Sequence, residues 1–223
     1  MDMAKHHYGC ESVTSHGDFE FHSDAEKAFI SGHFGFSYAQ SRLTNRFSFT
    51  FLRDPVDRLI SLYNFYRCRD PKEFSIYALA HAHDFANFVE VCSKKPSETG
   101  CSEAKGAYET VWNHMTWQLA YGWDAIGADP CRKTIFDFSG SELLNLAKSN
   151  LKSLDFIGLD RTFETDAKLI ASRLGMPHTQ IPLINASERT IRREDMAEET
   201  IRLVECVNSL DTELYTYARS LRS

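Results

Sequence analysis

The chain has 223 residues, of which 43% are hydrophobic and 25% are charged, and its formal net charge is −6 at pH 7. This composition is typical of one soluble globular domain. The acidic balance argues against a broad nucleic-acid-binding surface, which needs clustered lysine and arginine, but it allows a local basic pocket for one small anion. No segment approaches the roughly 20 apolar residues of a membrane span. As written, the chain is therefore expected to be cytoplasmic, with a membrane anchor upstream of Met1 as the open alternative.

The first 45 residues give weak local signals. Residues 1–22 show no hydrophobic period and are predicted to be an irregular segment. Ser23 is a good helix cap, and Glu26 follows three residues later, which predicts a short helix over residues 23–30. The glycines of the sequence GHFG, residues 32–35, then end this helix. None of the six cysteines forms a C-x-x-C pair, so we predict no metal site.

A strand followed at once by a helix is the sharpest local prediction. Residues 46–52 are rich in aromatic side chains, which favours a strand. Asp54 is a good N-cap and Pro55 suits the first helical position, so a helix should begin there. Apolar residues recur at helical spacing and predict a buried stripe formed by Val56, Leu59, Ile60, Tyr63 and Tyr66. The opposite side of this helix is predicted to carry Asp57, Arg58 and Ser61.

The rest of the chain alternates predicted helices and strands. We predict a short buried strand over residues 155–159, and helices over residues 72–92, 108–121, 141–154, 163–174 and 194–221. Strands that alternate with helices indicate an α/β fold with a parallel sheet. The length suits a single domain over residues 1–223.

Arg53 stands where the predicted strand ends and the predicted helix begins. Strand ends that lead into helix N-termini are common sites for anionic ligands in α/β folds. The guanidinium of Arg53 is suited to bind a phosphate, and Ser61 can add a hydroxyl to the same anion if the helix packs beside the strand end. The alternative is an ion pair of Arg53 with Asp54 or Asp57, together with a merely solvated Ser61.

Residues 49–67, FTFLRDPVDRLISLYNFYR, resemble the 3′-phosphate-binding motif of sulfotransferases that use 3′-phosphoadenosine 5′-phosphosulfate (PAPS). In that family an arginine at a strand end and a serine eight residues later bind the 3′-phosphate, and Arg53 and Ser61 occupy those positions. The pattern R-D-P-x-x-R-x-x-S is similar to the carbohydrate branch, which includes heparan and chondroitin sulfotransferases. The resemblance implies a P-loop-NTPase-like parallel sheet flanked by helices, PAPS as co-substrate, and sulfuryl transfer to a carbohydrate hydroxyl without a metal.

The resemblance also implies a catalytic base. ISGHF, residues 30–34, resembles a Gly-His element of the 2-O-sulfotransferase branch, and His33 matches the histidine that is the proposed base there. An imidazole titrates near neutral pH and can accept the proton of an attacking hydroxyl. The alternative is a histidine that fills a turn. Later segments of the family are similar to residues 113–122, 155–164 and 208–215.

Four further residues are weaker candidates. Ser187 and Arg189 lie in the loop INASERT, where the late loop of relatives reaches back to the nucleotide, and an ordinary turn is the alternative. Arg67 and Arg69 stand near the far end of the helix that begins at Pro55. They are suited to bind an acidic sugar, and simple solvation is the alternative.

The N-terminal region departs from the family pattern. Members normally begin with a strand and a loop containing a Pro-Lys pair, and this loop holds the 5′-phosphosulfate. The residues before His33 contain no such pair. The simplest interpretation is a truncated chain that lacks the first strand and this loop, and such a chain is expected to be weakly active or inactive and poorly soluble. The alternative to an enzyme is a remnant that keeps the 3′-phosphate half-site and binds nucleotide or a partner.

Overall fold

The computed structural model describes residues 2–14, 26–32, 34–94, 104–122, 133, 135–177 and 191–222. The chain divides into two units. The first unit contains Met1–Phe51 and Trp117–Pro182, and the second contains Leu52–Thr116 and Leu183–Ser223. Each unit combines two separated stretches of sequence, so its core depends on contacts between residues far apart in the chain. The single-domain organisation predicted for residues 1–223 stays a prediction.

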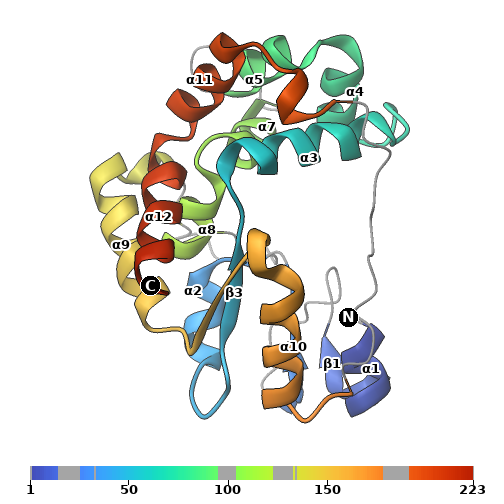
Figure 1. Cartoon of the computed structure of the whole chain (residues 1–223), viewed down its shortest axis with the longest axis vertical. Coiled ribbons are helices and arrows are strands. Elements are labelled where there is room, and N and C mark those ends of the chain that lie inside the picture. Colours follow the sequence, from blue (N-terminus) through green and yellow to red (C-terminus); the bar gives the residue numbers. More distant parts are fainter. Residues whose placement is uncertain are drawn as a thin grey trace. The chain divides into compact units, whose positions relative to one another are not determined.

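The first unit holds the strands. β3 (Phe49–Leu52) is hydrogen-bonded to β4 (Phe156–Leu159), and Figure 1 shows the two strands running in the same direction. β1 (Val13–Thr14) pairs with β2 (Phe29–Ile30) in parallel, with Val13 opposite Phe29. The strands predicted within residues 46–52 and 155–159 are therefore confirmed, although both are shorter at their N-terminal ends. The mixed α/β class, rich in helices and with small parallel strand pairs, is confirmed as well.

A side-chain contact sets the register at the entrance of β3 and β4. The carboxylate of Asp155 accepts hydrogen bonds from the backbone N–H and the hydroxyl of Ser48, at 2.8 and 2.7 Å. The backbone N–H of Phe156 donates to the carbonyl of Ser48 at 3.0 Å. The hydrogen bonds from Ser48 lower the pKa of Asp155 below its ordinary value. The two strands thus start from one shared pair of residues.

The N-terminal segment corrects two predictions. Residues 1–22 were predicted to be irregular, yet they contain α1 (Asp2–Tyr8) and strand β1. The predicted helix over residues 23–30 is wrong at its end, because Phe29 and Ile30 form β2. The reason is tertiary packing, which local sequence does not report. An apolar cluster of this unit joins these elements to the region of α10, and its buried members are Ala4, Val13, Ala171 and Met176.

The remaining helices of the first unit follow local signals. They are α2 (Phe36–Ala39), α9 (Gly140–Lys152) and α10 (Phe163–Arg173). α9 begins at Ser139, whose hydroxyl accepts from the N–H of Glu142 while the Glu142 carboxylate accepts from the N–H of Ser139. This reciprocal cap explains why α9 starts one residue before the predicted position. In the part of the chain that the structure describes, no helix has the length and apolarity needed to cross a membrane.

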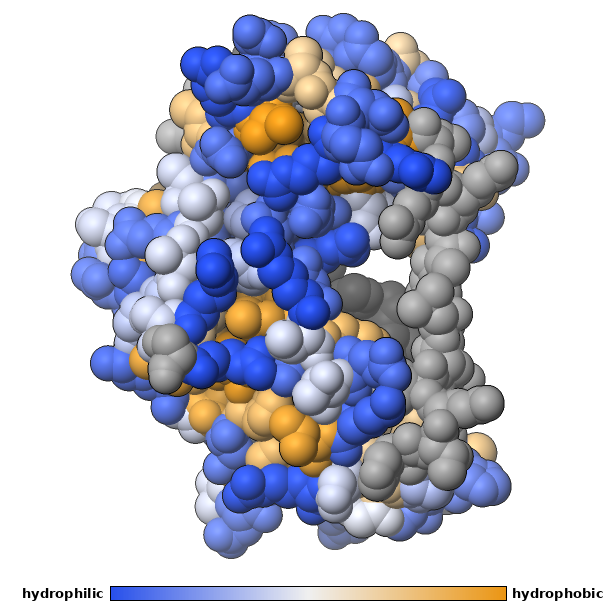
Figure 2. All heavy atoms as spheres, in the orientation of Figure 1, coloured by the Kyte–Doolittle hydropathy of each residue, from blue (hydrophilic) through white to orange (hydrophobic). Residues whose placement is uncertain are grey.

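One face of the first unit is apolar. Figure 2 shows orange atoms gathered over the region of β3, β4 and α10. On α10, Phe163 is 44% exposed and Leu169 is 54% exposed. The ring of Phe163 lies 5.0 Å from that of Phe51, and the ring of Phe49 lies 6.4 Å from that of Phe51. An exposed apolar face of this kind favours contact with another apolar surface.

The second unit is helical. Its helices are α3 (Pro55–Arg67), α4 (Ser75–Ala82), α5 (Phe85–Cys92), α7 (Ala104–Val111), α11 (Glu198–Val207) and α12 (Ser209–Ser220). α8 (His114–Ala120) begins in this unit and continues into the first. α3 lies at the centre of this arrangement, because it contacts α4, α11 and α12.

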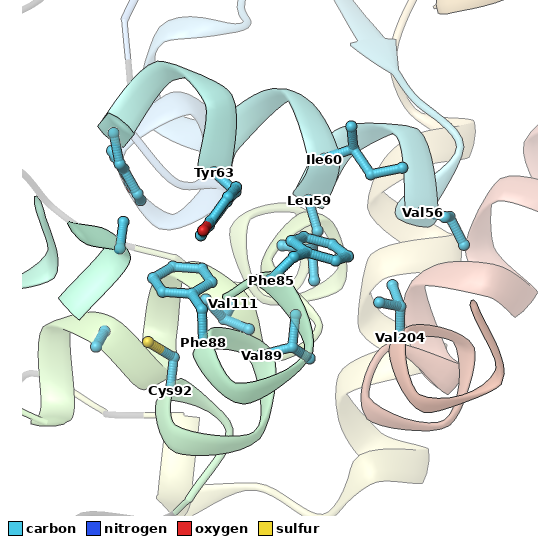
Figure 3. Close-up of a cluster of buried hydrophobic side chains, with 13 residues drawn as sticks. Val56, Leu59, Ile60, Tyr63, Phe85, Phe88, Val89, Cys92, Val111 and Val204 are labelled. Carbon is cyan, nitrogen blue, oxygen red and sulfur yellow. The ribbon is translucent and has the colours of Figure 1, made fainter. Parts of the chain in front are cut away.

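The buried stripe predicted for the first helix after the strand is confirmed. Val56, Leu59, Ile60 and Tyr63 of α3 belong to one buried apolar cluster, and Figure 3 shows Leu59 and Tyr63 pointing toward its other members. The opposite wall of this cluster comes from α5, α7 and α11, through Phe85, Phe88, Val89, Val111 and Val204. Burying aliphatic and aromatic side chains of this size stabilises a fold by about 1.5–3 kcal/mol each. The cluster therefore fixes which side of α3 faces inward.

Three helices that the sequence predicts as continuous are broken. The helix over residues 72–92 stops at Ala82, and Asp84 caps α5 by accepting from the N–H of Asn87 at 2.9 Å. The helix over residues 108–121 breaks at Asn113, which has a φ of 42°. The helix over residues 194–221 breaks at Asn208. At each break a polar side chain offers hydrogen bonds that compete with the helix backbone.

Candidate functional site

The exit of β3 and the start of α3 place Arg53 at the surface. β3 ends at Leu52, Arg53 is exposed, and Asp54 is the N-cap of α3. The carboxylate of Asp54 accepts hydrogen bonds from the N–H groups of Val56 and Asp57 at 3.0 and 3.4 Å, and Pro55 occupies the first turn. This confirms the helix start that the sequence predicts. Arg53 therefore stands next to a helix N-terminus, where anions are stabilised.

Ser61 lies in the second turn of the same helix and is half-buried. Helical geometry places it about 10 Å along the axis from the Asp54 cap. Asp57 is four residues before Ser61 and Asn64 is three residues after it, so the three residues share one face of α3. We call this the outer face; it is partly exposed at Asp57 and buried at Asn64. Joint binding of a phosphate by Arg53 and Ser61 stays a prediction.

A late segment of the chain runs along the outer face. Residues 191–193, which we call the strap, contact α3 at two levels. Asn64 donates from Nδ2 to the carbonyl of Ile191 at 2.9 Å and accepts from the N–H of Ile191 at 3.1 Å. Arg193 donates from Nη1 to Asp54 at 2.9 Å and to Asp57 at 3.4 Å. Arg193, a partner 136 residues from Asp57, was not a candidate in the sequence analysis, and the alternative ion pair of Arg53 with Asp54 or Asp57 stays a prediction.

Arg58 is not part of the apolar cluster, yet other parts of the second unit bury its guanidinium. The sequence places it with Asp57 and Ser61 on the side away from the core, but its guanidinium is buried, and Nη2 donates to the carbonyl of Thr110 at 2.9 Å. Burial lowers the pKa of Arg58, and the nearby carboxylate of Asp211 opposes that shift. Among the residues that the structure describes, Nη1 of Arg58 has no hydrogen-bond partner. Arg58 therefore fixes α3 to its neighbours.

Asp211 is the buried counterpart of Arg58. Its carboxylate accepts from the N–H groups of Met115 and Thr116 at 3.2 and 2.7 Å, and from the Thr116 hydroxyl at 2.7 Å. Burial raises the pKa of Asp211, while the Arg58 guanidinium and the hydrogen bonds at Thr116 work in the opposite direction. This carboxylate satisfies amides in the first turn of α8 and is held by α12, so it joins the two helices.

The two asparagines at the helix breaks interlock. The N–H of Asn113 donates to the side chain of Asn208 at 2.9 Å, and Nδ2 of Asn113 donates to the carbonyl of Val207 at 3.1 Å. In return, the side-chain oxygen of Asn113 accepts from the N–H groups of Leu210 and Asp211. The segments 113–122 and 208–215 were singled out by resemblance, and their polar residues hold the second unit together.

The two weaker arginine candidates lie at the other end of α3. Arg67 donates to the carbonyl of His81 at 3.1 Å. The guanidinium of Arg69 stacks over the ring of Phe65, with its central carbon 4.4 Å from the ring centre, and the carbonyl of Arg69 contacts His81 Nε2 at 3.0 Å. Thirteen residues of helix span about 20 Å. These arginines are therefore far from Arg53 along α3, and they anchor the end of α4.

Three predicted site residues, His33, Ser187 and Arg189, lie outside the residues that the structure describes. The residues next to His33 are described. The ring of Phe34 packs 4.9 Å from that of Tyr38. Gly35 approaches the backbone of Tyr121 and Gly122 so closely that a Cβ atom on Gly35 would clash with main-chain atoms. The second glycine of the GHFG sequence is thus required by backbone packing within the first unit.

A helix-rich α/β chain in which a strand leads through an exposed arginine into a capped helix is suited to bind an anionic ligand at that junction. A model of the sulfotransferase family matches residues 14–218. The chain belongs to the sulfotransferase family. No curated protein matches the chain closely enough to count as a relative. Sulfuryl transfer is the general activity of this family, which implies a sulfonate donor and a hydroxyl-bearing acceptor, and the match includes Arg53, Ser61 and the strap.

Proposed function

We propose that this chain transfers a sulfuryl group from PAPS to a hydroxyl of a carbohydrate-like acceptor. The observation that carries the proposal is the position of Arg53, exposed between the end of β3 and the capped start of α3, with Ser61 two turns along that helix. Arg53 would bind the 3′-phosphate of the nucleotide through its fork of N–H donors, and Ser61 would add its hydroxyl.

The charges around Arg53 support an anionic ligand. The charge of Arg53 contributes to the lowered pKa of Arg58, so the two guanidinium groups are near enough to repel each other. A bound phosphate would relieve this repulsion. The amides at the start of α3 are already used, since Asp54 accepts from two of them. The phosphate would therefore depend on side-chain donors more than on the helix N-terminus itself.

The other site residues enter the proposal with separate roles. His33 would accept the proton of the acceptor hydroxyl during its attack on sulfur. Ser187 and Arg189 would add contacts to the nucleotide. Arg67 and Arg69 would bind an acidic acceptor only if that acceptor is extended, because the length of α3 separates them from Arg53. An oligosaccharide that carries acidic sugars meets this requirement, and a small phenol does not.

A second candidate function is nucleotide binding without transfer. Arg53 and Ser61 would serve this candidate equally well, and residues 1–32 of the sequence contain no proline and hence no Pro-Lys pair. A lysine in such a pair would stabilise the charge that develops on the leaving phosphate. In this second candidate Arg53 and Ser61 bind the 3′-phosphate, and the chain acts by binding alone.

Calorimetric titration with adenosine 3′,5′-bisphosphate tests the shared part of both candidates. We expect wild type to bind and Arg53→Ala to lose at least about tenfold in affinity, because a charged hydrogen bond to phosphate contributes about 1.5–3 kcal/mol. Ser61→Ala should lose less, since it removes a single neutral donor. Arg202→Ala is the matched control, because Arg202 is exposed on α11 and pairs with Glu198. Equal binding by wild type and Arg53→Ala would contradict the half-site.

Turnover then separates the two candidates. Wild type and His33→Ala would be incubated with ³⁵S-labelled PAPS and a panel of acidic and neutral oligosaccharides. Label in an oligosaccharide with wild type, and its loss with His33→Ala, supports transfer. Nucleotide binding without label in any acceptor supports the binding-only candidate.

A further inference from the structure

The strap and the outer face of α3 form one connected contact. Asn64 is 2% exposed and holds Ile191 by two hydrogen bonds. Two residues later, Arg193 reaches Asp54 and Asp57 at the start of the helix. Ser61 lies on the same face between Asn64 and Asp57, so the strap passes along the flank of the proposed phosphate-binding serine. The contact joins a late segment of the chain to the element that carries the proposed half-site.

The acidic residues at the N-terminal end of α3 suggest what the Arg193 contact does. Asp54 and Asp57 place two carboxylates in and beside the first turn, next to Arg53. Carboxylates there stabilise the helix, because its N-terminus is positive. The same charges would repel a nucleotide phosphate bound by Arg53. One guanidinium, that of Arg193, contacts both carboxylates, so it compensates the charge at the place where an anion is proposed to bind.

We propose that Arg193 is a positioning residue for the nucleotide, which neutralises Asp54 and Asp57 and holds the strap on α3 so that a phosphate can approach Arg53 and Ser61. This proposal rests on the proposed function. Arg193 acts through the two carboxylates and does not itself contact the phosphate. It differs from an ordinary surface ion pair in two ways: it binds two acidic residues at once, and the Asn64 contact fixes its backbone nearby.

Because the Arg193 contact is partly exposed, dissolved salt can screen its charges. The side chains of Arg193, Asp54 and Asp57 are 35%, 16% and 32% exposed. Repulsion between uncompensated carboxylates and a phosphate at this depth is screened by salt, with a Debye length of about 10 Å at 0.1 M ionic strength. An electrostatic role for Arg193 therefore predicts a salt-dependent loss on substitution, whereas a purely structural role predicts a loss that salt does not change.

The test compares affinities for adenosine 3′,5′-bisphosphate at low and high salt. We expect Arg193→Met to weaken binding about fivefold at low ionic strength, and less than about twofold at 0.5 M salt. Arg193→Lys should keep most of the affinity, because it keeps the charge. Asp57→Asn in the Arg193→Met background should restore affinity, because it removes one of the uncompensated charges. Arg202→Met is the matched control, since its 2.9 Å pair with Glu198 lies on exposed α11 and should not affect binding.

Two results would overturn the proposal. One is an Arg193→Met variant that binds like wild type, and the other is an equal loss at both salt concentrations that Asp57→Asn does not restore. Hydrogen exchange in the nucleotide-free protein gives an independent reading. We expect the amides of residues 191–195 to exchange about tenfold faster in Arg193→Met. Unchanged exchange would contradict the proposal that Arg193 holds the strap on α3. If wild type binds no nucleotide, the proposed function and the phosphate role of Arg193 both fail. Hydrogen exchange then tests only whether Arg193 holds the strap on α3.

Discussion

Around α3, two arginines lie near aspartates, but only Arg193 forms hydrogen bonds with its carboxylates, whereas the inner pair, Arg58 and Asp211, acts through the electrostatic field alone. On the inner side, Arg58 and Asp211 are both buried, and the surrounding hydrogen bonds come from backbone groups of Thr110, Met115 and Thr116. On the outer side, Arg193 is about one-third exposed and meets its carboxylates from a segment outside any long helix.

This difference in burial predicts different effects of substitution: a loss of stability at the inner pair, and a change of local electrostatics at the outer contact. Removing one member of a buried pair leaves an uncompensated charge in a low-dielectric interior, which is strongly destabilising. An outer contact keeps access to water and counterions, so its loss changes local electrostatics more than global stability. The comparison therefore assigns Arg58 and Asp211 to the fold and Arg193 to the proposed site.

The largest expected effect is on the inner pair of charges, Arg58 and Asp211. Asp211→Ala should lower the free energy of unfolding by about 3–5 kcal/mol, because it leaves the Arg58 charge buried and removes the acceptor for amides at the start of α8. Urea unfolding followed by circular dichroism measures this loss. Glu213→Ala, exposed on the same helix, is the control. Arg58→Met in the Asp211→Ala background should recover part of the loss. A loss below about 1 kcal/mol for Asp211→Ala would show that Asp211 contributes little to the stability of the fold.

The thiols provide a second way to sharpen the comparison. Cys92 belongs to the apolar cluster under α3, and burial raises its thiol pKa to about 12. Cys68 and Cys206 are exposed. Because the thiolate is the reactive form, iodoacetamide at pH 8 should modify Cys92 at least about a hundredfold more slowly than the exposed thiols of Cys68 and Cys206. Peptide mass spectrometry gives the rates, equal rates in denaturant are the control, and rapid alkylation of Cys92 in the native chain would be inconsistent with this cluster.

An intermediate effect is expected at Asn64, the buried residue of the outer face that contacts the strap. Asn64 is 2% exposed, and its side chain forms two hydrogen bonds with Ile191 of the strap. Asn64→Ala removes two hydrogen bonds, so we expect a loss of about 1–2 kcal/mol in unfolding free energy and faster exchange of the Ile191 amide. Asn145→Ala, exposed on α9, should change little. Unchanged exchange at Ile191 would show that the strap does not depend on Asn64.

Local signals explain which parts of the fold and the site the sequence could predict. The start of α3 is encoded by adjacent residues, Asp54 and Pro55, and its buried stripe by spacing, so both predictions are confirmed. The partner of Asp57 is 136 residues away, and that of Asn113 is 95 residues away. No local pattern reports such pairs, which is why the burial of the Arg58 guanidinium was not predicted and why three helices were predicted without their breaks.

The smallest effect is expected at a surface pair that resembles the Arg193 contact only in distance. Arg202 donates to Glu198 at 2.9 Å, one turn apart on α11, and the two side chains are 64% and 77% exposed. Exposed pairs of this kind contribute little, because water competes for both charges and holding the two side chains costs entropy. Arg202→Met should therefore shift the melting temperature by less than about 1 °C and leave exchange at residues 191–195 unchanged. Arg193→Met, with its contact at the same distance, should speed exchange there. If the two variants behave alike in both measurements, burial and strap geometry add nothing to the outer contact, and Arg193 would be one more solvated surface charge.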